Sequence, residues 1–151
     1  MLLDPPGSTY WKSWYQFVDR ELAGRGLISR EDLTFVRLAE EPRSATDWIT
    51  EFYRVYHSQR YVGRRLILRL NRDVSDETLA TLNEEFRDIV VSGHIERTAA
   101  TPQEIEDGDN TELPRLALHF DRRSYARLRA MIDAINRDGD VEDPGRPSWS
   151  G

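Results

Sequence analysis

The sequence contains no cysteine among its 151 residues. A disulfide framework, a zinc cluster and a thiol nucleophile are therefore excluded. Its apolar runs are short, and none approaches the roughly 20 residues that a membrane-spanning helix requires. The opening pair Leu2-Leu3 is also too short, and wrongly flanked, for a signal peptide. We therefore expect a cytoplasmic protein with no membrane partner.

Positive charge is also scarce, because 21 basic residues face 27 acidic ones, for a formal net charge of −6. Residues 1–57 carry 7 basic and 9 acidic residues, residues 58–137 carry 13 and 14, and residues 138–151 carry 1 and 4. A general nucleic-acid binder needs a basic face that displaces counterions. We therefore expect no nucleic-acid partner, although the balanced first two blocks leave room for a local basic patch.

The first part of the chain predicts alternating strands and helices. Leu2-Leu3 has the character of a strand end, and apolar residues then recur at helical spacing from Tyr10 to Leu22. A short strand is predicted at 35–38, and a second helix from about Ala45 through Tyr56. This strand-helix-strand-helix order is typical of a terminal piece of an α/β, Rossmann-like sheet, and with its junction we assign it residues 1–63.

Residues 64–137 predict a different, α+β pattern. Strands are expected at 65–70, 94–98 and 114–120, with helices beginning after Ser75 and after Asp121. The order β-α-β-β-α is that of a ferredoxin-like unit without its last strand. We expect the first and third strands to be adjacent and parallel, the first at an open edge. Residues 101–112 should form a mobile acidic loop, and residues 138–151 a disordered tail.

Several stretches resemble a known family. The residues that carry the resemblance are Leu3-Asp4-Pro5-Pro6-Gly7, Tyr10-Trp11, Gly26-Leu27-Ile28-Ser29, and the runs 52–63, 82–90 and 119–125. Together they resemble the carboxyl-terminal part of the Lonely Guy, or lysine-decarboxylase-like, family of nucleoside-monophosphate phosphoribohydrolases. The run 64–137 resembles the extra α+β extension of the longer bacterial members.

The resemblance implies a doubly wound fold and an enzyme family that hydrolyses the N-glycosidic bond of nucleoside 5′-monophosphates. The family signature is Pro-Gly-Gly-x-Gly-Thr-x-x-Glu, whose glycines let a helix start hold phosphate. This chain has only the partial look-alike Pro6-Gly7-Ser8-Thr9, with no glycine pair and no glutamate at the required offset. We therefore expect no catalytic residue, no cofactor and no activity of this chain alone, and an assembly or accessory role.

The resemblance also makes Leu2-Leu3 the end of a central strand whose neighbours lie outside this chain. Trp11, Trp14 and Trp48 would then cover a parallel sheet that is supplied from elsewhere. Each exposed large apolar side chain forgoes roughly 1.5–3 kcal/mol of burial. We therefore expect a homo-oligomer, or a partner chain that supplies the missing Rossmann half. Residues 64–137 should fold alone, and residues 1–57 should not.

Two short stretches are candidate contacts for a phosphate or another anion, including a nucleoside monophosphate. Gly7, Ser8 and Thr9 lie where a strand ends and a helix begins, which is a common ligand position in open α/β sheets. Ordinary helix capping explains the same residues. His57 and Arg60 combine an imidazole and a guanidinium in one predicted turn. There the alternative is a helix carboxyl terminus whose dipole favours cations.

The remaining titratable residues predict no further site. Three scattered histidines without metal-ligand spacing give no metal centre. A second basic pair, Arg122-Arg123, is expected to bind the acidic residues 104–109. One alternative to the accessory role stays open, in which the chain is a stand-alone ferredoxin-like module that binds a small ligand or regulates a partner; this alternative rests on fold analogy.

Overall fold

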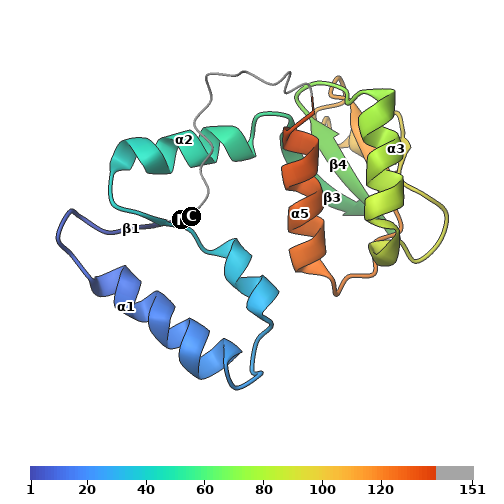
Figure 1. Ribbon diagram of the computed structural model, residues 1–151. Coiled ribbons are helices and arrows are strands. Elements are labelled where there is room, and N and C mark those ends of the chain that lie inside the picture. Colours follow the sequence, from blue (N-terminus) through green and yellow to red (C-terminus); the bar gives the residue numbers. More distant parts are fainter. Residues whose placement is uncertain (139–151) are drawn as a thin grey trace.

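The computed structural model describes residues 1–138 and has a mixed α/β architecture (Figure 1). The amino-terminal half contains β1 (Leu2–Leu3), α1 (Tyr10–Phe17), η1 (Val18–Ala23), η2 (Arg30–Phe35), β2 (Leu38–Ala39) and α2 (Pro42–Phe52). The η1 segment is a π-helical continuation of α1, and η2 is a 3₁₀ helix. β1 and β2 pair in parallel, so the predicted strand-helix-strand-helix order is present with the second strand displaced toward Ala39.

The rest of the chain forms a four-stranded antiparallel sheet with helices. Its elements are β3 (Tyr56–Val62), β4 (Arg65–Leu70), α3 (Asp76–Glu85), η3 (Arg87–Ile89), β5 (Glu96–Arg97), α4 (Pro102–Glu106), β6 (Arg115–Leu118) and α5 (Tyr125–Asn136). The strand order across this sheet is β3-β4-β6-β5. Ser75 caps α3 by accepting a hydrogen bond from the amide of Thr78, as its position predicts.

β3 is the strand that the sequence reasoning missed. The predicted helix through Tyr56 ends at Phe52, and Tyr56–Val62 forms a strand paired antiparallel with β4. Gly63, at a φ of 59°, begins the two-residue turn between these strands. Glycine at the first turn position suits the turns that join twisted antiparallel strands. The edge of β4 that was expected to be open is therefore paired within the chain.

The three predicted strands lie in the predicted order within the four-stranded sheet, but one predicted direction is wrong. The first and third predicted strands, β4 and β6, are adjacent and antiparallel rather than parallel. A helical crossover makes β4 and β5 parallel, and β5 is antiparallel to its neighbour β6. β6 must therefore also run antiparallel to β4.

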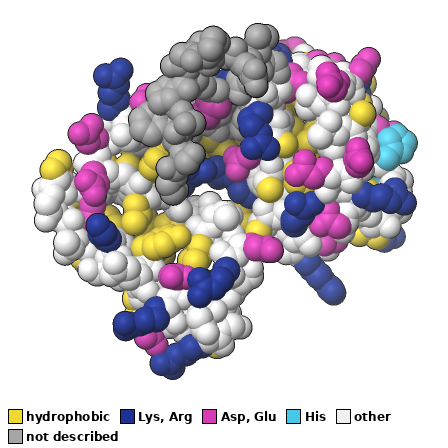
Figure 2. Space-filling model, viewed as in Figure 1, with side chains coloured by type: hydrophobic (Ala, Val, Ile, Leu, Met, Phe, Trp, Pro, Cys, Tyr) yellow, Lys and Arg dark blue, Asp and Glu magenta, His cyan; other side chains and the backbone are white. Residues whose placement is uncertain are grey.

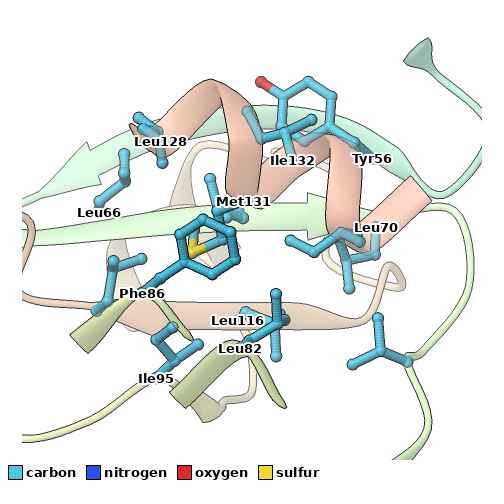
Figure 3. Close-up of a cluster of buried hydrophobic side chains, with 14 of the residues drawn as sticks. Tyr56, Leu66, Leu70, Leu82, Phe86, Ile95, Leu116, Leu128, Met131 and Ile132 are labelled. Carbon is cyan, nitrogen blue, oxygen red and sulfur yellow. The ribbon is translucent and has the colours of Figure 1, made fainter. Parts of the chain in front are cut away.

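A single apolar core lies between this sheet and its helices. Leu66, Leu68 and Leu70 of β4 face it, and each is fully buried. Figure 3 shows Phe86 and Met131 together near the centre of this cluster, with Leu128 and Ile132 of α5 above the sheet. The buried cluster contains no residue before Val55 within the described chain, so the core belongs to the second half.

The amino-terminal half has almost no core of its own. The buried apolar residues of positions 1–53 are Val18, Ala23, Ala39 and Ala45. α1 contains no buried residue. In Figure 1, α1 and β1 lie on the side of the molecule away from β3 and β4. This half meets the second chiefly where η2 and α2 pack against α5.

The acidic segment expected to be a mobile loop is ordered. Thr101 and Glu104 form a capping box that starts α4, and Glu104 is fully buried. Asp138, placed at the start of the predicted tail, is also buried and accepts hydrogen bonds from Ser75 and Arg72. The rest of that predicted tail, 139–151, lies outside the described residues. Within 1–138, no helix has the length and apolar content needed to cross a bilayer.

Candidate functional site

The turn at Gly7, Ser8 and Thr9 is organised by a buried carboxylate. Asp4 accepts hydrogen bonds from the amides of Trp11 at 3.0 Å and Lys12 at 3.3 Å, and from the Ser8 hydroxyl at 2.7 Å. Thr9 is the residue before α1, but its side chain makes no capping bond. The Asp4 carboxylate thus occupies the amides that would bind a phosphate. An anion could bind these amides only by displacing that carboxylate.

His57 and Arg60 lie on β3 rather than in a turn at a helix end. The ring Nδ1 of His57 is 2.9 Å from the Ser58 hydroxyl. Arg60 donates to Asp109 at 2.7 Å and to Asp107 at 3.0 Å, so its anionic partners come from within the chain. The structure does not bring these residues to the turn before α1, which lies on the other side of the molecule (Figure 1).

Arg60 belongs to a larger arginine–carboxylate network, which also contains Arg69, Arg115, Glu104 and Asp109. Arg69 donates to Glu104 at 2.9 Å and to Asp109 at 2.6 Å. Arg115 is 3.4 Å from Glu104 and donates to backbone carbonyl groups between positions 109 and 113. Arg69 and Arg115 alternate with the core leucines, so the network lies on the sheet face opposite the core.

The charges of this network favour its ionised form. Burial alone would raise the pKa of Glu104, but hydrogen bonds from Thr101 and Arg69 outweigh it and hold that pKa below its ordinary value. The hydrogen bond from Arg60 lowers the pKa of Asp109. The network thus fixes residues 101–113 against the sheet. Arginines within apolar strands, followed by a Thr-x-x-Glu capping box, are the sequence signals that could have found it.

The second basic pair does not contact the acidic segment as expected. Arg122 lies over the ring of Tyr61, with 4.3 Å between its guanidinium carbon and the ring centroid. It also donates to the carbonyl of Gly63 at 3.2 Å. The acidic segment is instead bound by the network arginines of β3, β4 and β6, because these strands pass beneath it.

Apolar side chains are exposed along the first helix. Two stripes run along α1 and into η1: the inward Trp11, Tyr15 and Val18, and the exposed Tyr10, Trp14 and Phe17. The exposed stripe, which we call the α1 aromatic face, has relative exposures of 69, 40 and 54%. Figure 2 shows further hydrophobic side chains at the surface between α1 and α2. Apolar residues therefore cover more of the helix than the chain itself packs against.

A hollow of about 430 Å³ lies between the two halves. We call it the aromatic–arginine pocket, after six of the residues that line it: Arg37, Trp48, Phe52, Tyr53, Arg129 and Arg137. Arg37 lies over Trp48 at 5.5 Å and Arg129 over Phe52 at 4.2 Å, measured to the ring centroids. No sequence pattern indicated this pocket, because its residues come from the start of the chain, the end of η2, the flank of β2, and from α2 and α5 with their flanks.

Among residues 1–138, no group of three or more histidine, aspartate or glutamate side chains could hold a metal ion. Comparison with protein-family models, with curated proteins and with solved structures finds no match to this chain.

Proposed function

We propose that this chain is an accessory part of a Lonely Guy-like, nucleotide-binding assembly. In this proposal its amino-terminal half completes a Rossmann-like parallel sheet supplied by another polypeptide. The observation that carries the proposal is the parallel β1–β2 pair beside the uncovered α1 aromatic face.

The β1–β2 pair is unusual as a free-standing element. It comprises two register pairs, Leu2 with Leu38 and Leu3 with Ala39. Parallel strands occur almost only in larger sheets that are covered on both faces. Leu3 is 41% exposed although strand residues of this kind are normally buried. Further parallel strands beside β1 would bury it and give the pair the neighbours it lacks within residues 1–138.

The α1 aromatic face supports the same proposal. Fully burying a large apolar side chain is worth roughly 1.5–3 kcal/mol. Tyr10, Trp14 and Phe17 could together gain several kcal/mol by packing against a partner, a sizeable share of the stability of a typical domain. A contiguous apolar stripe of this kind is typical of an interaction surface.

The second half acts in this proposal as a folded extension that holds the docking half in place. Its strand order resembles the ferredoxin-like arrangement, with β3 in the position of the missing last strand. Asn136 of α5 accepts hydrogen bonds from the amides of Val55 and Tyr56, both at 2.9 Å, and donates to the carbonyl of Phe52. This contact joins the end of α2 to the extension.

Catalysis is assigned to the partner rather than to this chain. The look-alike Pro6-Gly7-Ser8-Thr9 lacks the glycine pair of the family signature. The helix amides behind it are bound to Asp4. We therefore propose that a nucleoside monophosphate binds the partner's glycine-rich turn, and that this chain covers or stabilises that site.

Co-expression tests the proposal. The chain is produced with a polypeptide that carries the Pro-Gly-Gly-x-Gly-Thr-x-x-Glu half of a Lonely Guy-type domain, and the mass is measured by light scattering. We expect a heteromeric complex with wild type, none with Trp14→Glu, and an unchanged complex with Ile105→Glu. Ile105 is a suitable control because it is 61% exposed and lies on α4, outside the proposed face.

Measurements on the same purified proteins distinguish the proposed role from its alternatives. Equal complex formation by Trp14→Glu and wild type, with folding checked by circular dichroism, would refute the proposed face. A homodimer of the chain alone that Trp14→Glu dissociates would assign the face to a second copy. Release of base from AMP by the purified chain alone would overturn the non-catalytic role.

A further inference from the structure

We propose that the aromatic–arginine pocket binds a small, flat aromatic anion, a ring that carries a carboxylate or a phosphate. The inference rests on the walls of the pocket and is independent of the proposed docking role. The pocket volume of about 430 Å³ falls within the range of small-molecule sites, roughly 300–1,000 Å³.

Aromatic side chains form one wall of the pocket. Trp48 and Phe52 lie one helical turn apart on α2, and Tyr53 follows at the helix end. The rings of Phe52 and Tyr53 meet edge to face, with 4.9 Å between their centroids. Ile49 and Tyr53 are about half exposed, so this wall presents apolar surface to solvent. A flat ring is the ligand shape that such a wall contacts best.

Guanidinium groups supply the charge. Arg129 is paired with Asp133 at 3.1 Å. Within residues 1–138, by contrast, the side chains of Arg37 and Arg137 make no ion pair. Three arginines and two carboxylates, Glu51 and Asp133, line the pocket, so its net charge is positive. Arginine binds carboxylate and phosphate through paired, charge-assisted hydrogen bonds, and it also stacks on aromatic faces.

The pocket floor is fixed before any ligand arrives. Asn136 is buried, and its side-chain oxygen and nitrogen both bind backbone groups of the segment from Phe52 to Tyr56. The adjacent wall residues Phe52 and Tyr53 therefore have a backbone held by α5. A preformed wall lowers the ordering cost of binding, which favours a ligand site over an incidental hollow.

Three probe molecules distinguish the contribution of the aromatic ring to binding from that of the negative charge. We would titrate the full chain with 2-naphthoate, with its neutral amide and with acetate, by calorimetry and by ¹⁵N spectra of the tryptophan indole groups. We expect naphthoate to bind about tenfold or more tightly than the amide, since a hydrogen bond to an ionised carboxylate is roughly twice as strong as one between neutral groups. Acetate should not bind detectably, and the Trp48 indole signal should shift with naphthoate.

Variants assign the binding to this pocket. Arg37→Gln and Arg137→Gln should each weaken naphthoate about tenfold and leave the amide unchanged, whereas Trp48→Leu should weaken both. Arg64→Gln is the matched control, because Arg64 lies in the turn between β3 and β4, outside the pocket lining. Equal affinity for naphthoate and its amide, or equal losses in Arg64→Gln and Arg37→Gln, would overturn the proposal. So would the absence of binding to the folded chain.

Discussion

The guanidinium of Arg69 donates two hydrogen bonds to one oxygen of Glu104, from Nη2 at 2.9 Å and from Nε at 3.1 Å. Both side chains are almost completely buried, although 35 residues separate them in the chain. The relationship ties α4 to the sheet face that carries no apolar core. An acidic segment that composition alone marks as a loop thereby becomes part of the folded unit.

Removing the Glu104 carboxylate should destabilise the protein strongly. Glu104→Gln leaves Arg69 and Arg115 buried with one charge partner fewer, and breaking a buried ion pair from one side costs about 3–5 kcal/mol. Urea unfolding monitored by circular dichroism measures the loss. Glu106→Gln is the control, because Glu106 is exposed on the same short helix and should change stability little. Equal midpoints for the two variants would contradict a stabilising role for the network.

Local sequence patterns were sufficient to predict those elements that are determined by residues close together in the sequence. The Ser75 cap of α3 and the apolar spacing of α5 were readable because their residues lie within a few positions of one another. β3 was missed for a physical reason. Trp48, Phe52 and Tyr56 recur at four-residue spacing and so favour one long helix. The amide of Tyr56 instead binds Asn136, 80 residues away, and the strand pairs with β4.

The candidate sites also depend on contacts between residues far apart in the sequence, which a local pattern does not reveal. The residue types at Arg60 suggested an anion, and its anions are indeed present, but they are Asp107 and Asp109, 47 and 49 residues further along. A single sequence carries no mark of such a pairing. The exposure of Trp14 was predictable, because the helix pattern showed more apolar positions than the chain had strands to cover. Trp11 was expected to lie uncovered as well, but it turns inward, and the exposed Tyr10 and Phe17 were not predicted.

Acid should destabilise the protein through carboxylates that are held ionised in the fold. Burial opposes ionisation of Asp138, but hydrogen bonds from Thr78, Ser75 and Arg72 lower its pKa strongly, and the pKa values of Glu104 and Asp109 are also lowered. Below about pH 5 the unfolded chain, whose carboxyl pKa values are about 4, binds protons that the folded chain does not.

The resulting stabilisation is fully present near neutral pH and is lost as the pH falls toward the lowered folded-state values. Urea midpoints measured from pH 7 to pH 3 should therefore fall mainly below pH 5. Asp138→Asn should show a shallower fall than wild type, since it removes one of the responsible groups. A stability that stays constant down to pH 3 would be inconsistent with these lowered pKa values.

Asn136 should be the residue that most directly joins α5 to the end of α2. Asn136→Leu keeps a similar branched shape but leaves the amides of Val55 and Tyr56 without their acceptor. A buried polar group without a partner costs roughly 1–3 kcal/mol. We therefore expect the free energy of unfolding to fall by several kcal/mol when these backbone groups lose Asn136. Asn71→Ala removes one exposed bond, to the carbonyl of Tyr53, and should cost less than about 1 kcal/mol. Thermal unfolding of both variants measures the difference.

Dissecting the chain should locate its independent folding unit. The sequence predicts that residues 64–137 fold alone, but the structure places β3 in the sheet and Val55 and Tyr56 in the core. A fragment of residues 52–138 should therefore unfold cooperatively in urea and show dispersed amide signals. A fragment of residues 64–138 should be several kcal/mol less stable or unfolded, because it loses two core side chains and exposes the edge of β4.

Residues 1–53 should not fold alone, since their buried apolar side chains are one valine and three alanines. Protease resistance of that amino-terminal fragment, or equal stability of the two longer ones, would show that the core has been assigned to the wrong part of the chain.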